Sequence, residues 1–186
     1  MCSISGTAGI ISQTDIEHVE SSCRKQFHRG PDAQGFWVSP QKNVVLGHQR
    51  LSIIDLNPIS NQPFFTLDKK LAIVFNGEIY NHVEIRNELQ KLGYEFATDS
   101  DTEVLLFAYD HWGAECLKHL NGMWAFVIWD CRLGVDSEKL FFSRDRAGEK
   151  PFYYSLEKGC MTFSSELNGL NHDRKINLHS LNYYLS

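Results

Sequence analysis

The apolar run at residues 123–129 constrains the fold more than any other segment of this chain of 186 residues. A strand with one face in water alternates apolar and polar residues, whereas Met-Trp-Ala-Phe-Val-Ile-Trp does not. We therefore predict a strand that is covered on both faces, and hence a structure of stacked layers. A hydrophobic fraction of 42% supplies enough apolar surface to build such a core within one compact domain, 1–186.

Shorter apolar runs predict the remaining strands, and their order along the chain bears on the fold class. The runs lie at 35–38, 44–46, 71–75, 140–143 and 152–154, and the last of them should pair with a run at 161–163. Strands thus stand on both sides of a helical block, without a regular alternation of strand and helix. This order favours an α+β layered architecture over a parallel doubly wound sheet.

Two helices are predicted from their start signals. Asn81 precedes Glu84 by three residues, and Ser100 precedes Glu103 by the same spacing, which is the pattern of a capping box before an apolar helical face. We expect each helix to end at the next glycine along the chain. The tail at 176–186 has helical apolar spacing as well, and we expect it to lead into a further domain.

The composition argues against nucleic acids and membranes as partners. The formal net charge is −5, so no basic stripe is present that could neutralise a row of phosphates. No stretch approaches the roughly 18 consecutive apolar residues that span a bilayer. The first residues are small and uncharged, unlike a secretory signal. We therefore expect a cytoplasmic protein.

The five cysteines form no Cys-x-x-Cys pair and no spacing suited to zinc, which fits a reducing compartment and predicts no metal site. Cys2 is unusual because removal of Met1 would leave it with both a thiol and a free α-amino group. Their ordinary pKa values, about 8.5 and 7.7–8.0, allow proton transfer between them near neutral pH. The plain alternative is an incidental residue at a frayed terminus.

Short motifs downstream of Cys2 occur together with it in one known family. They are HRGPD at 28–32, GHQRLSI at 47–53, FNGEIYN at 75–81, SDTE at 100–103, RDRAGEKPFYY at 144–154 and SSE at 164–166. In this order they resemble the glutaminase domain of glutamine-hydrolysing asparagine synthetase, a class II glutamine amidotransferase. The resemblance covers nearly the whole chain.

This resemblance implies a fold and a reaction. The fold is of the N-terminal-nucleophile hydrolase type, a four-layer αββα sandwich of two antiparallel sheets between helical layers. In the reaction, Cys2 attacks the side-chain amide of L-glutamine, forms a glutamyl thioester, expels ammonia and is freed by water to give glutamate. The α-amine of Cys2 would carry the proton, so neither a cofactor nor a metal is expected in this chain.

The resemblance also assigns roles to individual residues. The Asn76 amide and the Gly77 N–H would form an oxyanion hole, although an Asn-Gly pair after an apolar run is also a hairpin signal. Arg50 would hold the α-carboxylate of glutamine, where a surface ion pair is the plain alternative. Asp101 would receive the ammonium, although it also suits the dipole of a helix start. Further substrate contacts are expected at Glu78, Leu51 and Ile53.

Other conspicuous residues have no role in this mechanism. The charges at 28–32 and 144–151 either lock loops around the site or are simply paired or solvated. Histidine titrates near neutral pH, which makes His48 a natural candidate for a catalytic base. The implied reaction does not use it, and we predict that all eight histidines are non-catalytic.

Two features depart from the family. Ser3 stands where the family usually has glycine, which would impair activity if the position needs a positive φ or a close approach of substrate. The sequence also lacks the Ser-Gly-Gly-x-Asp-Ser loop that binds ATP pyrophosphate in the family's synthetase domain. We expect ATP and Mg²⁺ to bind only in a missing synthetase domain or subunit, which would receive the ammonia.

Several alternatives stay open at this point. The chain is either a piece of a longer enzyme or a separate subunit, its ammonia acceptor is aspartate or another carboxylate, and a homodimer is compatible with both. A catalytically impaired domain that acts as a binding or regulatory module is the main alternative function. A hydrolase for another amide is disfavoured, because Arg50 and Asp101 suit the charged ends of a free amino acid.

Overall fold

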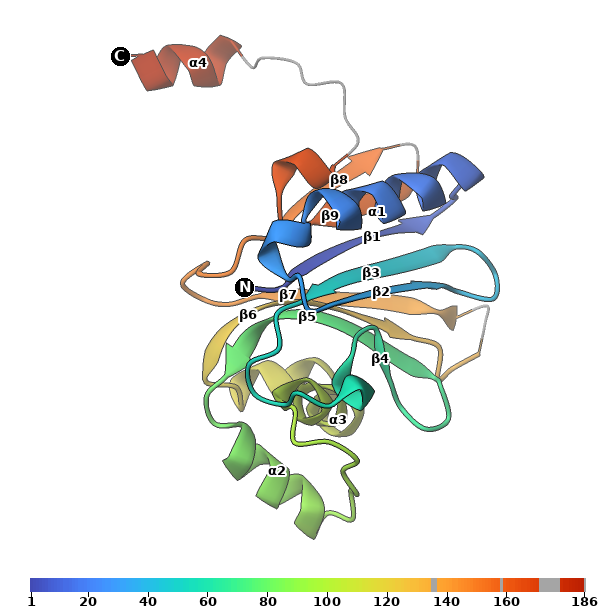
Figure 1. Ribbon diagram of the computed structural model, residues 1–186, viewed down its shortest axis with the longest axis vertical. Coiled ribbons are helices and arrows are strands. Elements are labelled where there is room, and N and C mark those ends of the chain that lie inside the picture. The colour runs from blue at the N-terminus through green and yellow to red at the C-terminus, as the bar shows by residue number, and fades with distance from the viewer. Residues whose placement is uncertain (135–136, 158, 171–177, 186) are drawn as a thin grey trace.

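The computed structural model describes residues 1–134, 137–157, 159–170 and 178–185. Two antiparallel sheets pack face to face between helices (Figure 1). The 5-stranded sheet has the order β2-β3-β1-β9-β8, and the 4-stranded sheet has the order β4-β5-β6-β7. The strands are β1 Ser3–Gly9, β2 Ala33–Val38, β3 Val44–Arg50, β4 Phe64–Phe65, β5 Leu71–Ile79, β6 Gly122–Asp130, β7 Lys139–Arg144, β8 Tyr153–Glu157 and β9 Cys160–Ser164. The α-helices are α1 Gln13–Lys25, α2 His82–Lys91, α3 Asp101–Trp112 and α4 Leu178–Leu185.

Strand β6 is covered on both faces, as its unbroken apolar sequence predicts. Phe126 and Ile128 pack into the core beneath α2 and α3, whereas Ala125 and Val127 pack into the core shared with the other sheet. All four side chains have no exposed surface. The neighbouring strand β5 divides its apolar residues between the same two cores. The two central strands of the smaller sheet therefore lie inside the stack of layers.

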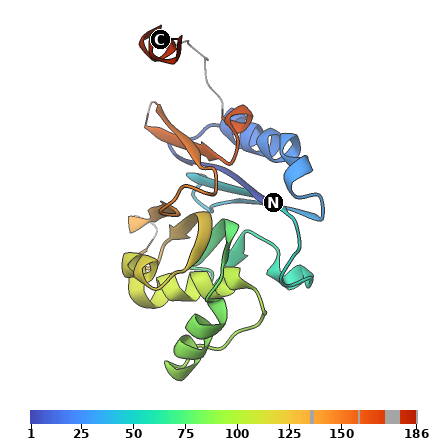
Figure 2. The same ribbon diagram turned by 90° about the vertical axis from the view of Figure 1, so that its left-hand side faces the viewer.

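Helices close both outer faces of the sandwich. On the larger sheet, Val19 and Cys23 of α1 pack on Val45 of β3. On the smaller sheet, Leu89 of α2 and Leu105 of α3 are buried against β5 and β6. Figure 1 shows α1 beyond one sheet and α2 and α3 beyond the other, and Figure 2 shows the same layers from the side. The predicted αββα sandwich is confirmed.

The predicted strands all form, and β8 pairs with β9 as expected. The two predicted helices form as α2 and α3, with Gly93 and Gly113 just beyond their ends. The pattern did not predict β1, β4 or α1. Helix α4 covers most of the predicted tail helix, and the rest of that tail, 176–177 and 186, lies outside the described residues. No helix in the described part of the chain is long and apolar enough to cross a membrane.

Neither predicted capping box is present. The Asn81 side chain instead bonds the loop at 119–121, accepting from one backbone N–H and donating to one carbonyl. The Ser100 hydroxyl does cap α3. The Glu103 carboxylate, however, accepts hydrogen bonds from the loop at 97–98 instead of from Ser100. Both glutamate spacings therefore misled the prediction, because backbone groups of nearby loops bind the Asn81 and Glu103 side chains instead.

Candidate active site

Cys2 lies at the start of β1, the central strand of the larger sheet. Because β1 pairs with β3, Cys2 lies beside the end of β3, where Arg50 and Leu51 follow each other. The Cys2 sulfur accepts a hydrogen bond from the Leu51 N–H at 3.4 Å and lies 3.6 Å from the Leu51 carbonyl oxygen. The Arg29 Nε donates to the Cys2 carbonyl at 3.1 Å. The main chain of Cys2 is thus held in place rather than frayed.

The Cys2 thiol is in its protonated form at neutral pH. Burial raises the pKa of this thiol, and the Asp101 carboxylate raises it further. The Leu51 N–H, the terminal ammonium and the Arg50 guanidinium act in the opposite direction without cancelling the effect of burial. Since the thiolate is the nucleophilic form of cysteine, a base within the site must accept the proton during any attack by this sulfur.

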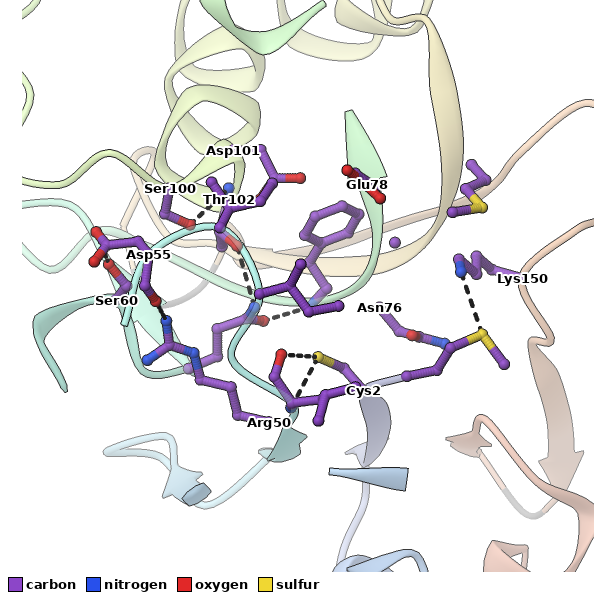
Figure 3. Close-up of a pocket in the computed structure, with 18 residues that line it drawn as sticks. Cys2, Arg50, Asp55, Ser60, Asn76, Glu78, Ser100, Asp101, Thr102 and Lys150 are labelled. Atoms are coloured by element: carbon purple, nitrogen blue, oxygen red, sulfur yellow. Dashed lines mark hydrogen bonds between the residues drawn. The ribbon is translucent and has the colours of Figure 1, made fainter. Parts of the chain in front are cut away.

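Asn76 presents an unpaired hydrogen-bond donor to the site. Its side chain is 1% exposed, and its Nδ2 has no partner among the described residues. Buried donors nearly always have a partner, so an unpaired one calls for an explanation such as a missing ligand. The hairpin interpretation of the Asn-Gly pair is wrong, because β5 continues through both residues and Asn76 pairs with Ala125 of β6. Figure 3 shows Asn76 close to Cys2.

Gly77 directs its backbone N–H away from β6. Along an antiparallel strand, the N–H groups of alternate residues point to the same edge. The N–H groups of Phe75 and Ile79 both donate to side chains beyond the outer edge of β5, at 2.6 and 3.0 Å. The Gly77 N–H lies between them and faces the same edge. A Cβ at Gly77 would come within 2.3 Å of the Met123 carbonyl oxygen, so a side chain does not fit here.

Arg50 is buried rather than solvated, which excludes the surface ion pair. Its guanidinium donates to the carbonyls of Asp55 and Asn57 and to the Asn61 side chain. Arginine has five N–H donors in a planar fork, so donors remain for a ligand. The bonds also tie the loop at 51–61 against the end of β3. Arg50 can therefore shape this loop and hold a carboxylate at the same time.

Asp101 opens α3 as a buried acid. Its Oδ2 accepts a hydrogen bond from the Ile79 N–H at 3.0 Å, and the residue is 6% exposed. Burial raises the pKa of Asp101 to about 6, against the lowering effect of the Ile79 N–H and of His82. A buried carboxylate without a cation is costly. The position is therefore suited to a positively charged ligand group. An exposed acid would be enough to complement the dipole at the start of α3, so the dipole alone does not account for this burial.

These residues line one cavity, with a volume of about 150 Å³. The cavity lies where the ends of β1 and β3 meet β5 and the start of α3 (Figure 3). Its lining includes every site residue that the sequence singled out, namely Cys2, Arg50, Leu51, Ile53, Asn76, Gly77, Glu78 and Asp101. A thiol, two outward donors, a guanidinium and a carboxylate therefore line one small cavity. Such a set can bind a zwitterionic amino acid and attack its side chain.

A family model described as a glutamine amidotransferase domain matches residues 1–186. The chain belongs to this family. This amidotransferase domain is 42% identical over 162 residues to glutamine-hydrolysing asparagine synthetase 1 of Bacillus subtilis (strain 168). The match covers 86% of this chain and 24% of that relative. It is 38% identical over 152 residues to amidase chry2 of Gibberella zeae, and this match covers 82% of this chain and 22% of that relative. The chain thus spans about a quarter of the length of these relatives.

A solved structure supports the fold assignment of the amidotransferase domain. The glutamine phosphoribosylpyrophosphate amidotransferase of Bacillus subtilis, complexed with ADP and GMP, superposes with a TM-score of 0.72. The match covers 90% of this chain and 42% of that chain, at 20% sequence identity. The two proteins share the fold, and the resemblance to a glutamine amidotransferase of the N-terminal-nucleophile type is confirmed.

Ser3 of the amidotransferase domain meets neither condition that would make a non-glycine residue unfavourable here, namely a positive φ or a close approach of substrate. It lies in the extended strand β1, is 1% exposed and does not line the cavity. Among the described residues, the non-glycine residues with positive φ are Lys42 and Lys69, so Ser3 is not one of them. A serine is therefore accommodated without backbone strain next to Cys2.

Two charged motifs contribute more to the site than the sequence could show. The Arg29 guanidinium bonds both the Cys2 carbonyl and the Glu166 carboxylate. The Asp145 carboxylate accepts from the N–H groups of Trp124 and Lys150, which fixes the loop after β7. The Arg29 charge is paired with Glu166, and the Asp145 carboxylate is held by backbone N–H groups, so both residues lock loops around the cavity. The burial of Lys150 and the partial burial of Arg29 are the signals that sequence alone does not carry.

His48 lies between the two sheets and does not line the cavity. Burial lowers the pKa of His48 to about 3, so the ring is neutral, and its Nε2–H donates to the Phe75 carbonyl at 3.1 Å. The proton is on Nε2 because a carbonyl can only accept. This bond joins β3 to β5 one residue before Asn76. A structural role therefore accounts for this histidine, and its lack of a catalytic role stays a prediction.

Replacing Asp101 by asparagine is expected to stabilise the ligand-free protein while weakening glutamine binding. A carboxyl whose pKa rises to about 6 on folding penalises the folded state above pH 6, and the penalty disappears as protonation nears completion around pH 4. Asp101→Asn should therefore raise the free energy of unfolding by roughly 1–3 kcal/mol at pH 7.5. Urea unfolding at pH 7.5 and pH 4.5 measures the difference, which should shrink at the lower pH.

The same variant should raise the KM for glutamine by roughly 10- to 100-fold, since a charge-assisted hydrogen bond to the ligand is lost. Exposed Asp99 offers a matched control, because Asp99→Asn removes an equal charge two residues away without entering the cavity. An Asp101→Asn protein that is less stable than wild type at pH 7.5, with unchanged KM, would contradict the assignment.

Proposed function

We propose that this domain hydrolyses the side-chain amide of glutamine, with Cys2 as the nucleophile once Met1 has been removed. The unpaired Asn76 Nδ2 beside the Cys2 sulfur carries the proposal. It forms a pair of donors with the outward N–H of Gly77, and none of the described residues accepts a hydrogen bond from the Asn76 Nδ2. Donors of this kind are suited to the negative charge that develops on a carbonyl oxygen when a nucleophile adds to it.

The attack proceeds through a thioester. The α-amine of Cys2 takes the thiol proton as the sulfur adds to the amide carbon, and the oxyanion forms at Asn76 and Gly77. The C–N bond then breaks, and the amine returns the proton to the leaving nitrogen, which departs as ammonia. Water adds to the glutamyl thioester, the C–S bond breaks, and glutamate leaves with the thiol restored. No histidine lines the cavity among the described residues, which supports the α-amine as the base.

Glutamine would be held by its charged end. The remaining donors of Arg50 take the α-carboxylate, and buried Asp101 takes the α-ammonium, whose charge offsets the burial of its carboxylate. Glu78 also lines the cavity and adds a second acid. Leu51 and Ile53 cover the bound amino acid from the loop that Arg50 ties down. A substrate lacking either charge would leave a buried group unpaired and bind more weakly.

The released ammonia would be used elsewhere. The relatives named above are about four times longer than the matched segment. We propose that an ATP-dependent synthetase domain or subunit, holding ATP and Mg²⁺, receives the ammonia and transfers it to aspartate or to another carboxylate. In this proposal, residues 176–186 lead toward that domain. The exposed apolar side chains of α4, Leu178, Leu181, Tyr183 and Tyr184, would then pack against it.

The glutaminase proposal is tested with purified protein whose intact mass shows that Met1 is absent. We expect it to release glutamate and ammonia from L-glutamine in equal amounts. We also expect 6-diazo-5-oxo-norleucine to label Cys2 with one equivalent and to stop the release. D-glutamine, which presents the two charges in the wrong arrangement, serves as the negative control. A Met-free, folded protein that releases no glutamate and takes up no label would refute the proposal.

A further inference from the structure

Lys150 carries a buried charge that no carboxylate of the described residues neutralises. The residue is 6% exposed and lines the cavity. Lysine is almost never buried to this degree unless it is paired. In the described part of the chain, no carboxylate lies within ion-pair distance of its Nζ. Its Nζ instead donates to the sulfur of Met1 at 3.3 Å, which is a neutral and weak acceptor.

The position of Lys150 is set by its backbone. Its N–H donates to the Asp145 Oδ2 at 2.9 Å, and its carbonyl accepts from the Arg144 Nε at 2.7 Å. The same Asp145 oxygen accepts from the Trp124 N–H of β6 at 3.2 Å. The loop after β7 is therefore anchored to the central strands of the smaller sheet. The side chain starts from a fixed point and reaches inward to the cavity (Figure 3).

The Met1 side chain separates this ammonium from Cys2. Figure 3 shows Lys150 pointing to the sulfur of Met1, the residue joined to Cys2. Removal of Met1 takes away the sulfur and creates the Cys2 α-amine at the other end of the same gap. The Lys150 ammonium then loses this partner in the cavity where the new amine is created.

We propose that Lys150 acts on Cys2 through its charge and keeps the thiol and α-amine in their reactive, singly protonated state at neutral pH. This inference rests on the proposed function, because it concerns the same nucleophile. The thiol and the α-amine titrate as a coupled pair, so the pKa for loss of the first proton is a property of the pair and not of either group alone. A cation beside the pair disfavours the doubly protonated form, whichever group loses the proton.

Other charges around the cavity act on Cys2 as well, and the Arg50 guanidinium lowers the pKa of its thiol. The groups that face Cys2 from the surrounding elements are Arg29, Arg50, Asp55, Glu78, Asp101 and Lys150. The guanidinium of Arg29 is bonded to Glu166, and that of Arg50 is bonded to loop oxygens. Asp101 acts in the opposite direction and raises the pKa of the Cys2 thiol. Lys150 and Arg50 are therefore the cavity cations without a carboxylate within ion-pair distance among the described residues, and of these two Lys150 is the one whose side chain contacts Met1.

The test measures how fast iodoacetamide alkylates Cys2 between pH 5 and pH 9 in Met-free protein, by mass spectrometry of the N-terminal peptide. The alkylation rate rises with pH, and in Lys150→Met the pH at the midpoint of this rise should increase by about one unit. Alkylation below the midpoint should therefore be about tenfold slower than in wild type. Lys150→Arg should keep the wild-type midpoint. Lys139→Met is the matched control, because it removes an equal charge from an exposed residue of β7.

A Lys150→Met protein with an unchanged midpoint would overturn the inference, and so would a loss of rate that is equal at every pH. If Lys150→Met does not fold, Lys150→Gln serves in its place with the same two outcomes. Alkylation requires no turnover of glutamine, so the inference and the glutaminase proposal can fail separately. In an active enzyme, the acidic limb of kcat/KM for glutamine should move by the same amount as the alkylation midpoint.

Discussion

Replacing Cys2 by alanine is expected to lower the rate of glutamate release from glutamine on the order of 10⁴-fold or more, to the background of the assay. Among the described residues that line the cavity, Cys2 has the sulfur that can add to the amide carbon to form a thioester and be released as a thiol when water adds. The donors at Asn76 and Gly77 remain, but without a nucleophile they have no developing charge to stabilise. A coupled assay for glutamate at pH 7.5, with ammonia measured in parallel, detects the loss.

Binding and folding should survive this substitution. Arg50 and Asp101 do not depend on the thiol, so calorimetry should show glutamine binding to Cys2→Ala with an affinity near that of wild type. Cys131→Ala is the matched control, since Cys131 is a partly buried, free thiol that does not line the cavity. It should keep the wild-type rate. Equal rates of glutamate release for Cys2→Ala and wild type would exclude Cys2 as the nucleophile.

The apolar strands could be predicted because their signal is local. Residues 123–129 need both faces covered, and any fold that buries them must stack layers. Strand β1 gives no such signal, although it is the central strand of its sheet. Its small residues are required by distant neighbours: a Cβ at Gly6 would approach the Phe163 ring to 2.3 Å, and the Ser5 hydroxyl meets that of Ser22 at 2.9 Å. Such demands are invisible in the local sequence.

The site could be predicted only as a set of residues, not as an arrangement. From the local sequence, Asn76 and Gly77 could be either a hairpin turn or a pair of oxyanion donors. Asp101 could be either an ordinary helix start or an ammonium site. Burial decides these cases, because an unpaired amide and an acid with a raised pKa are costly unless a ligand compensates. Lys150 was overlooked for the same reason, since a lysine in a charged motif is usually solvated.

Replacing Asn76 by alanine is expected to lower kcat by roughly 10²- to 10³-fold, or about 2.7–4 kcal/mol of transition-state stabilisation, with little change in KM. The oxyanion forms only during the reaction, so a donor aimed at it contributes to the transition state more than to binding. Steady-state kinetics on glutamine separate the two parameters. Asn81→Ala is the matched control, because its amide is used by the loop at 119–121 and lies outside the cavity.

Stability should distinguish this role from a structural one. The Asn76 Nδ2 makes no bond in the ligand-free protein, so its removal eliminates an unsatisfied buried donor and should leave the free energy of unfolding equal or slightly higher. Asn81→Ala should instead destabilise the fold by about 1 kcal/mol, since it breaks hydrogen bonds that exist. If Asn76→Ala loses stability and activity together, the amide supports the strand, and the oxyanion at this position must be stabilised by other groups.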